Sequence, residues 1–172
     1  SVKRTALFAC TLFVSACGAS STSSTAIPLR ETTITMAFTG DILPHSPLVA
    51  RAKRNAQGFS PMFEDITPLI ASADLAICHL ETPIAPQGES LSTFPFFGVP
   101  PTIANAIARA GFDRCSTASN HTYDRGSLGV DATVNALLNS GVLQSGMART
   151  PDEISPHVFN VKGIEISHLS YT

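Results

Sequence analysis

Residues 33–41 read TITMAFTGD, a run of β-branched and apolar residues that stops at a Gly-Asp pair. This composition predicts a buried β-strand that ends in a turn. Residues 75–80 (LAICHL) predict a second strand, and shorter candidates follow at 114–118 and 142–144. Helical patterns separate these strands, at residues 46–54, 61–72, 102–110 and 127–140. Strands that alternate with helices favour βαβ units and a largely parallel sheet, which places the chain in the α/β class.

Local signals mark the ends of several of these elements. Thr102 is expected to cap the third helix and Gly111 to end it. Pro68 is expected to interrupt the second helical pattern, because proline lacks an amide hydrogen. Lys162-Gly163 lies between two apolar runs and predicts a β-hairpin. The two flanking runs are residues 158–161 and 164–171.

A long connection, residues 83–101, contains five prolines and two glycines. Such a composition predicts a loop rather than a helix or strand. Its aromatic residues Phe94, Phe96 and Phe97 are expected to pack the loop onto the core. No internal repeat or second linker divides residues 33–172, which therefore form one predicted domain.

Residues 1–16 resemble a bacterial lipoprotein signal peptide. Basic residues precede an apolar run, 6–16, that is too short for a stable membrane span. The run leads into VSAC, residues 14–17, which predicts lipidation of Cys17. An ordinary secretory signal with an incidental cysteine is the alternative. Residues 17–32 are rich in Ser and Thr and predict a flexible tether. The protein is therefore expected in the cell envelope, lipid-anchored to the outer face of the cytoplasmic membrane or in the periplasm.

The composition of the 172 residues excludes several classes of protein. Hydrophobic residues make up 44% and charged residues 14%, which excludes global disorder. The formal net charge of −2 provides no basic surface for a nucleic-acid backbone, so no nucleic-acid partner is expected. Cys78 and Cys115 both lie in apolar runs, where buried thiols and a disulfide are both open interpretations.

Three of the predicted strands are followed by polar residues of a consistent kind. These are Asp41 and His45 after the first strand, His79 and Glu81 at the end of the second, and Asn120, His121 and Asp124 after the third. In open α/β sheets the carboxyl ends of neighbouring strands line one crevice, so the side chains are expected to converge. Carboxylate, amide and imidazole ligands suit a divalent ion such as Mn²⁺, Fe²⁺ or Zn²⁺. Such an ion polarises a phosphoryl or carbonyl oxygen and acidifies a bound water.

Each of these residues also has a purely structural interpretation. A Gly-Asp pair is common in turns and helix caps, so Asp41 alone is weak support for a ligand. His45 fits a surface position, and Glu81 fits a solvated loop. Asn120 fits a turn with left-handed backbone. The coincidence at three strand ends is what favours the metal site.

Five motifs along the chain resemble the CapA family of bacterial capsule synthesis and poly-γ-glutamate biosynthesis. They are residues 39–45 (TGDILPH), 73–83 (ADLAICHLETP), 118–126 (ASNHTYDRG), 141–149 (GVLQSGMAR) and 162–172 (KGIEISHLSYT). The resemblance covers residues 33–172. Each motif is weak alone, but five in the same order and spacing are specific.

The resemblance implies a calcineurin-like metallophosphoesterase-type fold, in which a β-sandwich is flanked by helices. It implies metal ligands at Asp41, Glu81, Asn120 and His121, with His45 near the site. His79 stands where the family usually has Asn, and its imidazole is expected to alter metal preference. Family members also carry a later His-x-Gly-x-Glu-like motif that this sequence lacks. The chain is therefore expected to be an N-terminal fragment, with a fold incomplete at the C-terminus and an open site.

Two functions are open on these grounds. One is a metal-dependent hydrolase or transferase acting on phosphoester or amide bonds of an envelope polymer, with His121 and Asp124 as catalytic residues. The other is a non-catalytic partner that binds the anionic capsule polymer or poly-γ-glutamate and assists export by a membrane synthase. Because the chain is acidic overall, binding a polyanion requires a local positive site, for which the metal centre is the candidate.

Overall fold

The computed structural model describes residues 31–154 and 156–172. The predicted signal peptide, the lipidation site Cys17 and nearly all of the predicted tether lie outside the described residues. Residues Thr32–Thr172 form a compact unit of their own. Among the described residues, no helix combines the length and apolar character needed to cross a membrane.

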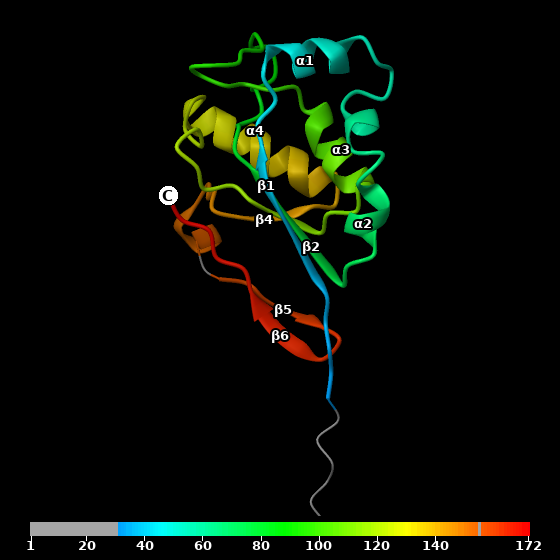
Figure 1. The fold of residues 1–172 in the computed structure, drawn as a ribbon. Coiled ribbons are helices and arrows are strands. Elements are labelled where there is room, and N and C mark those ends of the chain that lie inside the picture. Colours follow the sequence, from blue (N-terminus) through cyan, green and yellow to red (C-terminus); the bar gives the residue numbers. More distant parts are fainter. Residues whose placement is uncertain (1–30, 155) are drawn as a thin grey trace, which may run out of the picture. The chain divides into compact units, whose positions relative to one another are not determined.

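A four-stranded parallel sheet forms the centre of this unit (Figure 1). Its strands are β1 (Met36–Ile42), β2 (Leu75–Leu80), β3 (Arg114–Ser116) and β4 (Leu143–Ser145), and they lie in chain order across the sheet. The α/β class and the parallel sheet are therefore confirmed. β1 begins and ends three residues later than predicted, so Asp41 lies within the strand and pairs with His79 of β2. The register between these strands shifts between Phe38 and Asp41.

Helices connect the strands. They are α1 (Ser46–Lys53), η1 (Ser60–Met62), α2 (Thr67–Ala71), α3 (Thr102–Arg109), α4 (Gly126–Asn139) and η2 (Pro151–Ile154). The predicted interruption near Pro68 is confirmed, since Pro68 lies in the first turn of α2 and the pattern is divided into η1 and α2. The prediction that Thr102 caps α3 is wrong. Pro101 occupies the cap position with a φ of −64°, and this preset helical angle makes Thr102 the first residue of the helix.

The core lies between the sheet and its connecting helices. β2 contributes Ala76, Cys78 and Leu80, and these pack with apolar residues of the helices. The principal buried helical residues are Val49 and Ala52 of α1, Ile70 of α2, Ile103, Ala104, Ala106 and Ile107 of α3, and Leu137 of α4. Successive parallel crossovers of one hand place the connecting helices on the same face of a sheet. Cys78 and Cys115 lie opposite each other in β2 and β3 and form a disulfide, which resolves the two interpretations of these thiols.

A second, two-stranded antiparallel sheet follows the parallel one. It consists of β5 (Val158–Val161) and β6 (Ile164–Ser167), which confirms the predicted hairpin. Lys162 and Gly163 have φ angles of 51° and 88°, as a two-residue turn with positive φ at both positions requires. The Lys162 Nζ lies 2.6 Å from Asp74 Oδ1, which ties the hairpin to the residue preceding β2. Figure 1 shows the hairpin near the amino end of β1 and α1 near its carboxyl end.

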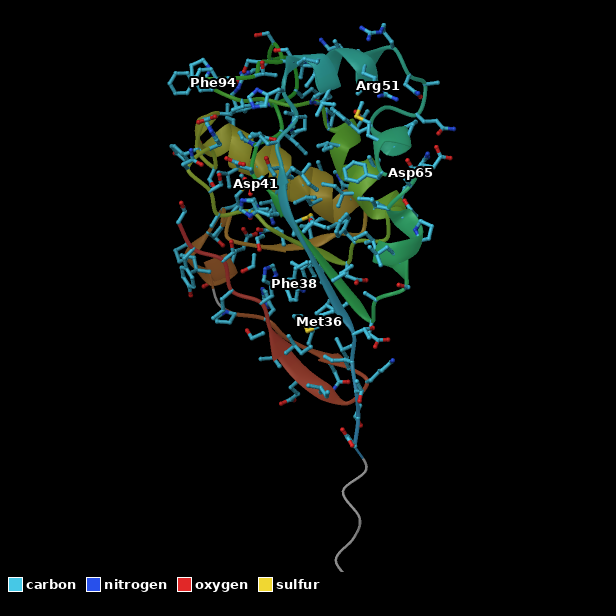
Figure 2. The ribbon with its side chains drawn as sticks, in the orientation of Figure 1. Met36, Phe38, Asp41, Arg51, Asp65 and Phe94 are labelled. Atoms are coloured by element: carbon cyan, nitrogen blue, oxygen red, sulfur yellow. A yellow bond between two sulfur atoms is a disulfide. The ribbon has the colours of Figure 1, made fainter. Side chains whose placement is uncertain are left out.

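The loop at residues 83–101 packs through one aromatic residue rather than three. Phe97 is 1% exposed, whereas Phe94 and Phe96 are 74% and 66% exposed. The expectation that all three pack onto the core is therefore wrong for two of them, and Figure 2 shows Phe94 at the periphery. Arg125 holds this loop, because its guanidinium donates to the carbonyl oxygens of Phe97 and Ser90 at 3.0 and 2.9 Å.

Candidate active site

The first pair of polar side chains comes from neighbouring strands. Asp41 of β1 pairs in register with His79 of β2, which brings both side chains to the same place on the sheet. The His79 Nε2 lies 3.8 Å from Asp41 Oδ1. The Asp41 side chain is 62% exposed, so this carboxylate is open to solvent and to a ligand. Figure 2 shows Asp41 toward the end of β1 that leads to α1, with Met36 toward the hairpin.

Glu81, directly after β2, is the most unusual ionisable group near this pair. Its side chain is only 12% exposed, and its Oε2 atom is buried without a hydrogen-bond partner among the described residues. Burial and the neighbouring negative charge of Asp41 both raise the pKa of the Glu81 carboxyl. A carboxylate that is buried without a partner is expected to attract a cation.

His121 comes from the turn after β3 and lies beside Glu81. Ser119 shapes this turn, because its amide donates to Thr122 Oγ1 at 2.8 Å and its Oγ accepts the His121 amide at 3.1 Å. The His121 Nε2 lies 4.0 Å from Glu81 Oε1. The structure therefore brings together four of the predicted site residues, from three strand ends. They are Asp41, His79, Glu81 and His121.

Asp124 lies behind His121. Its Oδ2 is 2.8 Å from His121 Nδ1 and accepts the backbone amide of Phe97 at 2.7 Å. An ionised carboxylate only accepts hydrogen bonds, so His121 donates through Nδ1 and presents Nε2 to Glu81. A carboxylate that fixes the ring orientation of a histidine in this way is common behind metal-binding histidines.

Two predicted ligands do not contact this group in the structure. Asn120 is exposed, and its Oδ1 accepts a hydrogen bond from Ser119 Oγ at 3.1 Å. His45 is exposed at the cap position of α1, and its ring centroid lies 5.3 Å from that of Phe97. Phe97 in turn lies edge-on to His121 at 4.7 Å. His45 and His121 thus contact the same phenyl ring, which sequence reasoning did not single out as part of the site.

The donor types of this group suit a divalent ion. Ligand atoms bound about 2.0–2.2 Å from one ion lie about 3–4 Å from each other. The Asp41–His79 and Glu81–His121 separations of 3.8 and 4.0 Å are near the upper end of this range. Within residues 31–154 and 156–172, no set of three or more His, Cys, Asp or Glu side chains is already arranged to hold a metal. The buried, unpaired Glu81 Oε2 is the atom whose environment a cation would most improve.

Comparison with protein families identifies a match over most of the chain. The family model described as "Bacterial capsule synthesis protein PGA_cap" matches residues 35–172. No curated protein matches the chain. The matched range includes all four strands of the parallel sheet and every residue of the candidate site.

Proposed function

The chain belongs to the bacterial capsule synthesis protein family PGA_cap, and from this premise we propose that it is an envelope lipoprotein of capsule or poly-γ-glutamate biosynthesis with a metallophosphoesterase-like metal site. Membership of this family supports a role of the protein in capsule synthesis. The parallel sheet with its separate antiparallel hairpin supports a fold of the metallophosphoesterase type.

One observation carries the metal-site proposal. Side chains from the carboxyl ends of β1, β2 and β3 meet around Glu81, whose Oε2 is buried and has no partner within the described residues. Such a group destabilises the fold unless it is protonated or neutralised. The neighbouring Asp41 makes ionisation less favourable still, as the raised pKa of Glu81 indicates. A bound divalent cation would reverse this balance, because both carboxylates would then face positive charge.

The residues have distinct roles in this proposal. Asp41, His79, Glu81 and His121 would hold the ion, and Asn120, next to His121 in the chain, would offer an amide oxygen. A bound Mn²⁺, Fe²⁺ or Zn²⁺ would polarise a phosphoryl or carbonyl oxygen of the substrate and acidify a bound water.

Asp124 fixes the tautomer and ring direction of His121 through the 2.8 Å contact at Nδ1. It is therefore a positioning residue rather than a catalytic one.

The membrane anchor is proposed from residues 1–17, in which basic residues and a short apolar run lead into VSAC, with lipid on Cys17. The test is expression of the Cys17→Ser variant in a bacterial host, followed by separation of membrane and soluble fractions. We expect the wild-type protein in the membrane fraction and the variant released from it. Equal membrane association of both proteins would remove the lipid anchor from the proposal.

Elemental analysis of the purified full-length protein tests the metal site. We expect a stoichiometric transition metal in the wild-type protein and its loss in Asp41→Ala and His121→Ala, together with any phosphoesterase turnover. Glu165→Gln is the matched control, because Glu165 lies exposed in β6 away from the site. A wild-type protein without transition metal, prepared without chelators, would refute the proposal.

A further inference from the structure

Arg114, at the start of β3, is a buried arginine whose positive charge has no negative partner. It is 4% exposed. Within residues 31–154 and 156–172, no carboxylate lies within 4.0 Å of its guanidinium. Burial lowers its pKa, although an arginine stays protonated in proteins. A buried charge without a counter-charge destabilises a fold, so an anionic partner is expected.

The existing contacts of Arg114 hold its guanidinium without neutralising it. Its Nε donates to His168 Nδ1 at 3.4 Å, and the group lies over the ring of Phe159 with 4.5 Å to the centroid. Since His168 accepts at Nδ1, its Nε2 carries the hydrogen and donates to Ser116 Oγ at 2.9 Å. Burial and the Arg114 charge both lower the pKa of His168, which keeps that ring neutral at pH 7. The terminal Nη1 and Nη2 groups make no hydrogen bond within the described residues.

Cavities lie directly beside this guanidinium. Arg114 lines one of about 350 Å³ and an adjoining one of about 340 Å³. His157 lines both and is exposed. Glu153 also lines both, but Arg149 binds it, with Nε 2.9 Å from Oε1, so its charge is already neutralised. Cavities of this size accommodate a small-molecule ligand or one unit of a polymer.

We propose that Arg114 forms a second, metal-independent binding site, which binds a carboxylate group of an anionic polymer. The charge balance supports a monoanion, because one guanidinium beside a neutral His168 neutralises a single negative charge. The planar fork of Nη1 and Nη2 matches the two oxygens of a carboxylate. Thr122 and Tyr123 also line the larger cavity and belong to the same turn as His121. A polymer with regularly spaced carboxylates that is bound at Arg114 would therefore share its cavity with the turn that carries His121. The assignment to γ-linked polyglutamate rests on the proposed function.

Calorimetric titration of the full-length protein with a short γ-linked glutamate oligomer tests this site, with and without chelator. We expect binding that survives chelation. Arg114→Met should weaken it about tenfold to a hundredfold, the range for hydrogen bonds to a charged group. Arg114→Lys keeps the charge but lacks the fork, and we expect an intermediate loss.

A surface variant keeps the test valid if replacement of Arg114 unfolds the protein. His157→Glu places a negative charge in the lining of both cavities and should weaken binding about fivefold, whereas His157→Gln should not. Unchanged affinity in Arg114→Met and His157→Glu would overturn the site. Equal affinity for a glutamine oligomer, or tighter binding of inorganic phosphate, would overturn the carboxylate assignment.

Metal content, measured on the same samples, separates this proposal from the proposed function. A wild-type protein that contains the metal but does not bind the oligomer counts against the Arg114 site alone. A wild-type protein that binds the oligomer but is purified without chelators and contains no transition metal counts against the metal centre alone.

Discussion

Replacing Glu81 by Gln is expected to stabilise the metal-free protein and to abolish its stabilisation by metal. Glu81 has a raised pKa because it is buried and lies near Asp41. A group whose folded-state pKa is raised contributes stability that is complete below its unfolded pKa and is lost as pH rises through the folded value. At pH 7 the metal-free wild-type protein therefore carries a penalty that the neutral amide of Gln avoids.

The magnitude follows from the environment of the carboxylate. A buried group left without a partner costs about 1–3 kcal/mol, and Glu81 is 12% exposed with one oxygen unpaired. Because the second oxygen faces His121, we expect the lower part of this range, a gain of about 1–2 kcal/mol for Glu81→Gln. For the folded unit Thr32–Thr172 that corresponds to a rise of about 3–7 °C in Tm.

The effect of metal should have the opposite sign. A ligand at about 100 times its Kd stabilises the folded state by about 2.7 kcal/mol, so Mn²⁺ should raise the Tm of the wild-type protein. Glu81→Gln lacks the charged ligand and should show little response. Thermal unfolding at pH 7, with chelator and then with Mn²⁺, is the assay. Glu165→Gln, an exposed carboxylate in β6, should behave as the wild-type protein in both conditions.

Two results would refute this reasoning. If Glu81→Gln lowers the Tm of the metal-free protein, the buried carboxylate is stabilised by its surroundings and needs no cation. If Mn²⁺ raises the Tm of the wild-type and variant proteins equally, the ion binds elsewhere. In the metal-free wild-type protein, stability should also rise on acidification toward pH 5 relative to the variant, since protonation of Glu81 relieves the same penalty.

Three further outcomes are expected. Asp124→Asn removes the charge that orients His121, so Mn²⁺ affinity by calorimetry should fall about tenfold to a hundredfold, and unchanged affinity would exclude a positioning role. Replacing Cys78 and Cys115 by Ala should lower the free energy of unfolding in urea by about 3–4 kcal/mol, because their disulfide closes a segment of 37 residues; equal stability of both proteins would contradict this. The pKa of Asp74 is lowered by Lys162 and by the Thr35 amide. Its contribution is therefore present above its unfolded pKa near 3.8 and is lost as pH falls through the lower folded value. Asp74→Asn should flatten the pH dependence of stability below pH 4, and parallel acid-unfolding curves would show that the ion pair is not formed.

The fold could be predicted to the level of its elements. The features that were predicted correctly depend on neighbouring residues. They are the apolar runs of β1 and β2, the break in the helical pattern just before α2, which contains Pro68, and the turn at Lys162-Gly163. The first residue of α3 was predicted wrongly, because the dihedral angle of Pro101 rather than the hydroxyl of Thr102 set the start of that helix. The function class came from the order of five motifs, and the family match supports it.

The site was predicted in part. Polar residues at consecutive strand ends identified Asp41, Glu81 and His121, because parallel strands in chain order bring their carboxyl ends together. The separation of His45 from the other candidate ligands by the Phe97 ring could not be predicted from the residues around His45. It depends on a loop that is far away in the sequence. The burial of Arg114 without a carboxylate beside it, among the described residues, could not be predicted either. A strand of three residues does not reveal which side chains surround it.

The amino-acid order by itself determined the α/β class, the hairpin and the residue types available at the sheet edge, because backbone preferences and hydrophobic periodicity act over a few residues. Only the tertiary structure decided that Cys78 pairs with Cys115 and that Asp124 stands behind His121. It also decided that, among the described residues, Glu81 Oε2 is buried without a hydrogen-bond partner and Arg114 is buried without a negatively charged one. The physical reason is that burial and side-chain direction depend on the packing of distant segments. These properties determine which carboxylate or guanidinium still needs a ligand.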